Sequence, residues 1–430
     1  MRLPGRIAAA IDVLADIEAH RRPVAEALKA WGLANRFAGA GDRAAIGNLV
    51  YDALRRRASH AWAMGSDAPR ALVLSVAVRD WGEPIDRLNA SFVGDRFAPP
   101  QVSDAEAERL AAPEPLSDAP DHVRGDVPEW TVPHFRASFG DDWLEEARGL
   151  AGRPPLDLRV NTLKSSRDRM LRSLEHLAPD TEMLIPNGIR FPAGARDSRT
   201  PNVQIEEGYL TGGFEVQDFG SQIVATLAGA RGGEQVLDLC AGAGGKTLAM
   251  AAEMQNRGQI FAYDSDRARL APIYDRLKRN GARNVQVRPP RPGALDDLVG
   301  KLDRVVVDAP CTGTGTWRRQ PTAKWKLTPE QVGARVVEQR HILAEAARYL
   351  RPGGTLVYIT CSILNEENAA QALAFLADRP EFAAVPGNRV WMGHFSGAKV
   401  RARFSPEGGV MVTPHLSGTD GFYAIQMQRR

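Results

Sequence analysis

The sequence predicts a protein of the α/β class, in which a mostly parallel sheet follows an all-α domain and a small α+β subdomain. Two observations support this prediction. After residue 213, short apolar runs alternate with helical patterns, which is typical of a parallel sheet covered by helices on both faces. Before residue 95, apolar residues recur at helical spacing. We therefore expect domains at 1–125, 126–212 and 213–430.

Composition narrows the possible functions. The chain has 430 residues and a net charge of only +3, so a nucleic-acid partner would require a local basic surface. The three cysteines lie far apart without a CxxC pair, and the eight histidines show no metal-ligand pattern. These features argue against a zinc cluster or a disulfide framework and favour reduced thiols. We expect no metal.

The sequence carries no sign of export. Acidic residues interrupt the apolar stretch at the N-terminus, which argues against a secretory signal. The longest strongly apolar run, 71–78, is too short to cross a bilayer. We therefore expect a cytoplasmic monomer with no membrane partner.

The N-terminal helices are indicated by two sets of apolar residues at helical spacing, which are Ile7, Ile11, Leu14 and Ile46, Leu49, Val50, Ala53, Leu54. Three arginines, 55–57, follow the second set. They are either a solvated helix end or a patch that contacts phosphates. A proline-rich linker follows over 98–133, with one short helix expected near 105–112. A strand is expected over 156–164 and a helix over 168–176.

The C-terminal half contains five apolar strand patterns separated by helices such as 267–280 and 329–350; the strands are 236–239, 259–263, 284–287, 304–307 and 355–359. Ligands of open α/β sheets bind beyond the carboxyl ends of the strands. Five candidate site residues lie at or just after such strand ends: Gly242, Asp264, Asp308, Cys311 and Cys361. We expect a site where these strand ends meet.

A glycine-rich stretch, 236–247, reads as a strand, a tight turn and a helix N-terminus. Glycines admit close approach of a ligand, and the free N–H groups suit a carboxylate or a phosphate. A phosphate-binding P-loop would need glycine at Cys240, and a dinucleotide fingerprint would need glycine or alanine at Thr247. S-adenosyl-L-methionine fits better, since Asp264 ends the next strand and suits the ribose. A structural turn in another α/β enzyme remains the alternative.

Two cysteine motifs sharpen this hypothesis. Asp308-Ala309-Pro310-Cys311 and Thr360-Cys361-Ser362, together with the glycine turn, strongly resemble the Sun-type (Fmu- and Nop-like) family of RNA cytosine-5 methyltransferases. The segments 159–164, 214–222 and 413–423 also resemble that family. The arrangement from Arg43 through Tyr51 to the arginine run resembles the RNA-binding domain of the antitermination factor NusB.

This resemblance implies a Rossmann-like methyltransferase domain preceded by a NusB-like domain. It implies an enzyme that uses S-adenosyl-L-methionine to methylate RNA cytosines at C5. Small-subunit ribosomal RNA is the first expected substrate and tRNA the second. A catalytically inactive RNA-binding factor is the alternative from a different class, and DNA or protein is an alternative target.

The family's residue roles transfer to matching positions. C5 of cytosine is a poor nucleophile until a thiolate adds to C6, which is covalent catalysis. The resemblance makes Cys361 the nucleophile, Cys311 the residue that assists product release, and Asp308 a hydrogen-bond partner of the ring near N3 that also lies near the cofactor. DNA cytosine methyltransferases attack with the Pro-Cys cysteine instead, and two structural thiols are the plain alternative.

The same transfer identifies cofactor and RNA contacts. Asp264 would bind the ribose, and Lys246 would reach the methionine carboxylate. The methionine end would be lined by Cys240, Ala241, Gly242, Ala243, Gly244, Gly245 and Lys246. The residues expected to contact RNA are Arg159, Lys164, Arg318, Arg319, Lys324 and Trp325. The alternative is that the cations are ordinary surface charges and that Trp325 belongs to the core.

Two departures from the family pattern stand out. Gly242-Ala243-Gly244 replaces the usual Ala-Pro-Gly of the cofactor turn. The region after the third strand, 287–293, lacks the acid that often contacts adenosine. The adenine contact is therefore unassigned.

Overall fold

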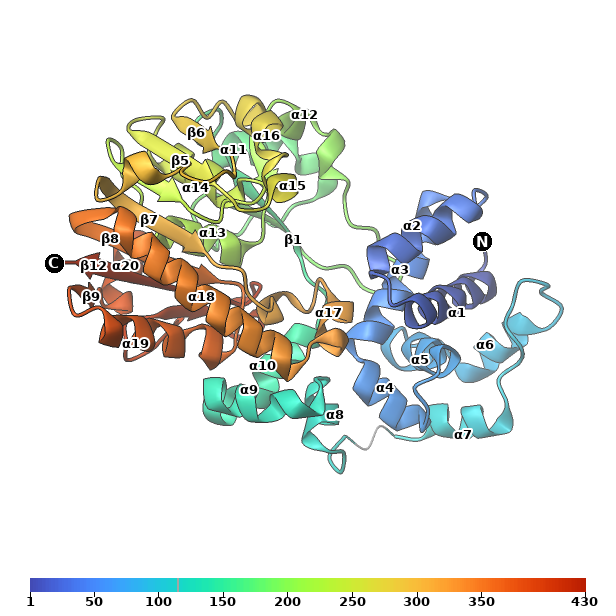
Figure 1. The fold of residues 1–430 in the computed structure, drawn as a ribbon. Helices are drawn as coiled ribbons and strands as arrows, with labels where there is room; N and C mark the ends of the chain where they lie inside the picture. Colours follow the sequence, from blue (N-terminus) through green and yellow to red (C-terminus); the bar gives the residue numbers. More distant parts are fainter. Residues whose placement is uncertain (114–115) are drawn as a thin grey trace. The chain divides into compact units, whose positions relative to one another are not determined.

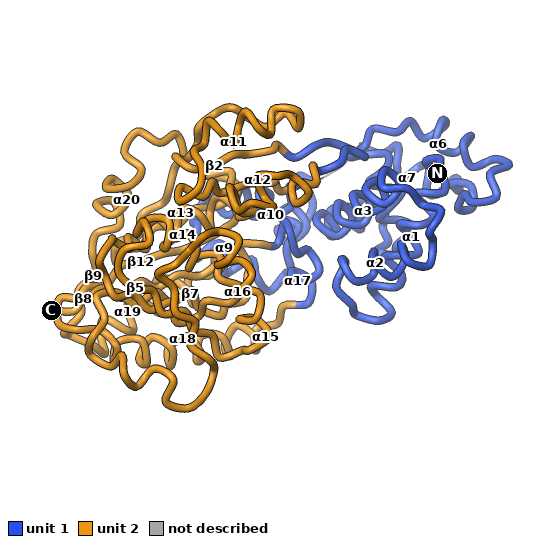
Figure 2. The backbone as a smooth tube through the Cα atoms, turned by 90° about the horizontal axis from the view of Figure 1, so that it is seen from above, with its two compact units in different colours: residues 1–153, 193–200, 317–326 blue, residues 154–192, 201–316, 327–430 orange. Residues whose placement is uncertain are grey.

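The computed structural model describes residues 1–113 and 116–430 (Figure 1). The chain forms two compact units, coloured separately in Figure 2. Unit 1 contains 1–153, 193–200 and 317–326, and unit 2 contains 154–192, 201–316 and 327–430. Among the described residues, no helix is long and apolar enough to cross a membrane.

Unit 1 is helical. Its helices are α1 (Leu3–His20), α2 (Val24–Ala34), α3 (Ala40–Arg55), α4 (Arg57–Met64), α5 (Pro69–Ser75), α6 (Ile85–Phe92), α7 (Asp104–Ala111), α8 (Asp121–Gly125), α9 (Val132–Phe139), α10 (Trp143–Ala151) and α17 (Pro321–Lys326). The residues that predicted helices, among them Ile7, Leu14, Ile46 and Leu49, are fully buried in one core. The helical N-terminal region is confirmed. Pro115 of the expected linker lies outside the described residues.

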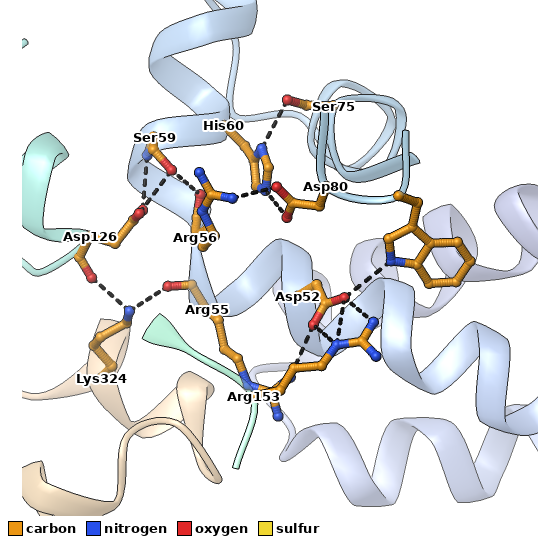
Figure 3. A network of polar contacts seen from close by, with 11 residues as sticks. Asp52, Arg55, Arg56, Ser59, His60, Ser75, Asp80, Asp126, Arg153 and Lys324 are labelled. Carbon is orange, nitrogen blue, oxygen red and sulfur yellow. Dashed lines mark hydrogen bonds and ion pairs between the residues drawn. The ribbon is translucent and has the colours of Figure 1, made fainter. Parts of the chain in front are cut away.

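A buried polar network connects the helices of unit 1 (Figure 3). Asp52 of α3 accepts hydrogen bonds from Arg55 and Arg153, and His60 of α4 contacts Ser75 and Asp80 through its two ring nitrogens. The arginine run 55–57, which joins the end of α3 to the start of α4, takes part in such pairs. Arg56 pairs with Asp80, and Arg57 pairs with Glu18 and Asp67. The run therefore has internal partners, which argues against the phosphate-contacting alternative.

Unit 2 begins with a small antiparallel sheet of order β2-β1-β3. Its strands are β1 (Leu156–Val160), β2 (Gly188–Phe191) and β3 (Phe214–Val216), with helices α11 (Arg167–Ser173) and α12 (Glu207–Leu210) between them. The strand expected over 156–164 ends at Val160, because the chain turns at Asn161, whose side-chain oxygen accepts the Leu163 N–H.

The main sheet of unit 2 has the path β10-β11-β12-β8-β7-β4-β5-β6, with β9 paired to β12. Its strands are β4 (Gln235–Asp238), β5 (Gln259–Tyr263), β6 (Val285–Arg288), β7 (Leu302–Asp308), β8 (Leu350–Thr360), β9 (Phe382–Ala384), β10 (Arg403–Phe404), β11 (Val410–Val412) and β12 (Phe422–Arg429). Strands β4 to β8 are parallel, and β12 runs antiparallel to β8. The order reverses at β4, which pairs with both β5 and β7, so a crevice is expected at its carboxyl end.

Helices cover both faces of the main sheet, as Figure 1 shows. They are α13 (Phe219–Leu227), α14 (Gly245–Glu253), α15 (Arg267–Leu270), α16 (Ile273–Asn280), α18 (Pro329–Tyr349), α19 (Ala369–Asp378) and α20 (Gly387–Phe395). The short helix α21 (Pro414–Ser417) buries none of its own residues. Leu343 of α18 packs in one core cluster, and Ile223 of α13 packs in another with Met250 of α14. The helix expected over 267–280 is two helices, because Pro272 interrupts it.

The predicted fold class is confirmed, since a mostly parallel α/β sheet follows a helical region. The grouping by compactness assigns 126–153 to the helical unit and most of 154–212 to the unit of the main sheet. The domain boundaries expected at residues 125 and 212 stay a prediction.

Candidate functional site

The glycine turn joins β4 to α14 at the carboxyl edge of the main sheet. Gly242 has a φ of +50° and Gly244 a φ of +82°, conformations that L side chains rarely adopt. A Cβ at Gly244 would also lie 2.5 Å from Cγ1 of Ile273. Glycine is therefore required at Gly244 by both backbone angle and space, and the turn presents the N-terminus of α14 at the strand end.

Asp238 ends β4 and is fully buried. Thr247 Oγ1 donates a hydrogen bond of 2.6 Å to its Oδ2, while its Oδ1 has no partner among the described residues. Burial first, and then the nearby Asp308 and Asp264, raise the pKa of Asp238 to about 7. The sequence analysis assigned no role to this residue, although a strand-final acid before a glycine turn is a usable signal.

Asp264 directly follows β5 and faces the same turn. Its carboxylate accepts the Gly242 N–H at 2.9 Å and the Asp266 N–H at 2.9 Å. Only 2% of the residue is exposed. A carboxyl acceptor is thus held by backbone amides beside the turn, where a ribose contact was expected.

Lys246 and Asp308 form an ion pair of 2.6 Å between Nζ and Oδ2. Lys246 comes from the first turn of α14, and Asp308 ends β7. The ammonium also lies 5.2 Å from the centre of the Phe422 ring. The structure therefore places Lys246 against a carboxylate of the protein at the crevice where a cofactor carboxylate was expected.

The two motif cysteines meet. Cys311 follows β7 and Cys361 follows the adjacent parallel strand β8, and their Sγ atoms are 3.3 Å apart. The Gly315 N–H donates to the Cys361 carbonyl at 2.9 Å. A Cβ at Gly315 would lie 2.1 Å from the Gly421 carbonyl oxygen, so this close packing requires glycine. The loop after β7 is thus fastened to the loop after β8.

Two of the three thiols, those of Cys311 and Cys240, have raised pKa values. The contact with Cys361 and burial raise the pKa of Cys311 well above its usual value, and the carboxylate of Glu367 adds to this rise. Burial and three nearby carboxylates likewise raise the pKa of Cys240. Cys311 and Cys240 therefore stay protonated near neutral pH and are poor nucleophiles.

Glu367 is a further buried group at this site. Its carboxylate accepts the Thr312 N–H at 2.9 Å, the Thr312 hydroxyl at 2.5 Å and the Gln339 side-chain N–H at 3.0 Å. The residue is completely buried. It fixes the backbone directly after Cys311. The sequence analysis missed it, because its partners lie far apart in the chain.

Comparisons with known proteins show which family this chain belongs to. The sequence model of 16S rRNA methyltransferase RsmB/F matches residues 225–428, and that of the RsmF/B-like ferredoxin-like domain matches 127–193. Ribosomal RNA small subunit methyltransferase B of Shewanella oneidensis is 31% identical over 314 residues, covering 73% of this chain and 69% of that protein. The chain belongs to the RsmB/F family.

One further relative and two solved structures are similar to this chain. Ribosomal RNA small subunit methyltransferase B of Klebsiella pneumoniae is 32% identical over 308 residues, and the chain spans 66% of its length, slightly under two thirds. PH0851 shares the fold with a TM-score of 0.75 at 24% identity, covering 100% of this chain and 99% of that one. A methyltransferase homologue from Pyrococcus horikoshii matches with a TM-score of 0.58 at 24% sequence identity, covering 74% of this chain and 100% of that one.

S-adenosyl-L-methionine is the cofactor of the RsmB/F family, as predicted. The residues present fit it. The unpartnered, buried Oδ1 of Asp238 offers an acceptor to an ammonium group, and Asp264 offers one to hydroxyls. The amides of the first turn of α14 have no acceptor within the helix. Among the described residues, no group of three or more His, Cys, Asp or Glu is placed to hold a metal ion.

Two of the expected RNA contacts lie in unit 2. Arg159 of β1 is only 7% exposed and donates to Gln217 Oε1 and to the Gly245 carbonyl, both at 2.7 Å. Burial lowers the pKa of Arg159 to about 10. Lys164 donates to the Thr211 and Arg279 carbonyls at 2.8 and 2.6 Å. Burial argues against an RNA contact at Arg159, which instead supports the glycine turn.

The other four expected contacts belong to unit 1. Lys324 is 1% exposed and donates to the Arg55 and Asp126 carbonyls, both at 2.6 Å (Figure 3). Trp325 Nε1 donates to the Leu54 carbonyl at 2.6 Å. Arg318 is 4% exposed, and Arg319 is half-buried. Lys324 and Arg318 are thus buried in the helical core, which argues against RNA contacts there.

Proposed function

We propose that this protein is an S-adenosyl-L-methionine-dependent RNA cytosine-5 methyltransferase that acts on small-subunit ribosomal RNA. The observation that carries the proposal is the pair of thiols, 3.3 Å apart, at the ends of adjacent parallel strands. A single buried cysteine is usually structural, but two thiols beside a cofactor turn suit a reaction that adds and then eliminates sulfur. The ribosomal target rests on the names of the relatives.

The chemistry divides between the two thiols. In the proposed reaction, the Cys361 thiolate bonds to C6 of cytosine, which makes C5 nucleophilic. The bound cofactor supplies an electrophilic methyl group. A base then removes the C5 proton, the electron pair of that C–H bond re-forms the C5–C6 double bond, and the C6–S bond breaks so that Cys361 leaves as thiolate. Cys311, whose Sγ lies 3.3 Å from that of Cys361, is placed to hydrogen-bond the departing sulfur and so to assist product release. Asp308 hydrogen-bonds the ring near N3.

The cofactor would lie along the glycine turn. Residues 240–246 would line its methionine end, and Asp264 would take the ribose hydroxyls. A cavity of about 410 Å³ lies next to Asp264, and its lining includes Tyr263, Ser265, Asp296 and Glu345. Its acidic residues are candidates to replace the acid that is missing after β6. We propose that the adenine lies there. Equilibrium binding of S-adenosyl-L-methionine by Asp296→Asn tests this placement, and unchanged affinity contradicts it.

Three variants test the proposed activity. Radiolabelled S-adenosyl-L-methionine and total RNA from cells lacking this protein are incubated with wild type, Cys361→Ala or Cys311→Ala, and denaturing gels are searched for protein–RNA adducts. We expect labelled 5-methylcytosine with wild type, no adduct with Cys361→Ala and a trapped adduct with Cys311→Ala. Trapping by Cys361→Ala instead would reverse the two roles.

A catalytically inactive RNA-binding factor is the second candidate, and the missing acid after β6 is the observation that favours it. Such a factor would show no binding of S-adenosyl-L-methionine and no labelled RNA. We also propose that the N-terminal helical region is NusB-like and binds RNA. The cytoplasmic location, the monomeric state and tRNA as an alternative substrate stay predictions.

A further inference from the structure

A polar cavity of about 400 Å³ opens in unit 2 at the amino edge of the main sheet. Its lining includes Glu234 directly before β4, Asp303 and Arg304 at the start of β7, and Thr355 of β8. These strands are parallel, so their other ends carry the glycine turn and the cysteines. The cavity is therefore separate from the methyl-transfer site, and the proposed function does not use it.

Four arginines line this cavity, and only two of them are neutralised. Arg304 pairs with Glu234 at 3.0 Å, and Arg351 pairs with Asp303 at 2.6 Å. Arg231 and Arg389 also line it. Their guanidinium groups have no ion pair or hydrogen bond among the described residues, so the lining carries two uncompensated positive charges.

His394 of α20 lines the cavity, and its pKa is affected by the positive charges there. Burial first, and then the charges of Arg231 and Arg304, lower the pKa of His394. The imidazole is therefore uncharged at neutral pH and leaves the net positive charge of the cavity lining unchanged. An anion entering the cavity would meet two guanidinium groups, whose planar N–H forks match phosphate oxygens.

The lining also restricts what kind of phosphate ligand fits. The residues around the cavity include Gly229, Gly353, Gly393, Gln426 and Gln428, and no Phe, Tyr or Trp is among them. Recognition of a free nucleotide or a splayed base usually relies on stacking against such rings. A backbone phosphate needs only cations and hydrogen-bond donors, and contacts of this kind set the register of a nucleic acid without reading its sequence.

We propose that this cavity binds a backbone phosphate of the RNA, giving the catalytic unit a second RNA contact at the sheet edge away from the cysteines. The inference rests on the proposed function, which supplies RNA as the substrate. It assigns Arg231 and Arg389 as the contacting residues and leaves Arg304 and Arg351 as their neutralised neighbours.

The test compares two double variants of the full-length protein. Arg231→Ala/Arg389→Ala removes the uncompensated charges, and Arg283→Ala/Arg401→Ala removes two exposed arginines of unit 2 that do not line the cavity. Equilibrium filter binding of a labelled ribosomal RNA fragment is measured over a series of KCl concentrations without cofactor. We expect the cavity variant to bind about tenfold more weakly, with a salt slope smaller by about 1 to 2.

Several outcomes would overturn the proposal. One is an affinity and salt slope equal to those of the control variant. Another is a shift of the His394 imidazole resonances by inorganic phosphate but not by an RNA oligonucleotide, which would mean a site for free anions. Unchanged binding of S-adenosyl-L-methionine shows that the variant is folded. Because the assay needs no methyl transfer, wild type that binds RNA without methylating it would contradict only the proposed activity.

Discussion

Two buried lysines, one in each compact unit, are satisfied in opposite ways. Lys246 in unit 2 faces the Asp308 carboxylate at 2.6 Å. Lys324 in unit 1 donates to the carbonyls of Arg55 and Asp126 at 2.6 Å. An opposite charge offsets the desolvation cost of a buried ammonium more strongly than carbonyl dipoles do. Accordingly, burial above all lowers the pKa of Lys324 to about 8.

The difference indicates separate purposes. Lys246, paired with a carboxylate at the end of β7, lies where a ligand can meet it. A lysine that donates to backbone carbonyls attaches α17 to the end of α3 and to the residue after α8, and its charge is a cost that the hydrogen bonds offset. We therefore expect loss of Lys246 to reduce activity, and loss of Lys324 to reduce stability.

The largest effect is expected at Lys246. In Lys246→Met, Asp308 loses its cation at the crevice where the base and the cofactor are proposed to meet. We expect kcat/KM for methyl transfer to fall about 10²- to 10³-fold, the loss typical of one preorganised electrostatic group. Steady-state transfer of label to RNA measures this. Lys246→Arg should recover part of the activity. A nearly normal kcat/KM in Lys246→Met would contradict a functional role for Lys246.

Lys324→Ala is expected to leave the chemistry intact and to destabilise unit 1. The variant loses the packing of a buried apolar stem and leaves two buried carbonyls without donors, while it relieves one buried charge. We expect the free energy of unfolding to fall by about 2 to 3 kcal/mol. Hydrogen exchange in peptides from α3 and α17 measures this locally.

Lys326→Ala is the matched control for Lys324→Ala, because Lys326 is exposed and donates to one carbonyl, that of Arg21. It should change stability by less than about 0.5 kcal/mol. Equal effects of the two variants would show that burial of Lys324 has no special role. A loss of kcat in Lys324→Ala at full occupancy of the folded state would place its function in catalysis instead.

Glu367 sharpens the comparison, because it is a buried ionisable group whose hydrogen-bond partners are uncharged, as those of Lys324 are, but it lies beside the thiols. Its carboxylate raises the pKa of Cys311. Glu367→Gln keeps the size and removes the charge, so the pKa of Cys311 should fall and the alkaline limb of the pH–rate profile should move to lower pH. We expect kcat to fall about tenfold, since the loop after Cys311 loses one of its acceptors. A lower kcat with an unmoved profile would mean a purely structural role.

The sequence predicted the carboxyl edge of the main sheet well. A parallel strand delivers the residue at its end to a known edge, so Asp264, Asp308, Cys311 and Cys361 come together once the strands are recognised. Asp238 needed a further step, because its unpartnered oxygen shows only when the turn has closed over it. Glu367 depends on Thr312 and Gln339, whose approach no local pattern encodes.

The sequence could not show how α17 is used. Cations around an aromatic residue predict an exposed surface when the helix stands alone, because charge usually seeks water. Here the end of α3 supplies carbonyls at Leu54 and Arg55 that no further helical turn satisfies, and Trp325 and Lys324 donate to them. Whether a lysine contacts RNA or completes a helix end is decided by tertiary packing, which residue types alone do not reveal.

The smallest expected effect is a dependence of stability on pH. The folded pKa of Lys324 is about 8, whereas an unfolded lysine has about 10.4. Between these values the unfolded chain binds more protons, so stability rises with pH in this window and is lost as pH falls through 8. From pH 7 to 9 the gain is on the order of 1 kcal/mol.

Urea unfolding of wild type and Lys324→Ala at pH 7, 8 and 9 isolates this contribution, since all other groups titrate in both proteins. The stability difference between them should widen as pH rises. A constant difference would mean that Lys324 stays charged throughout, and that carbonyl dipoles satisfy a buried ammonium as well as a carboxylate does.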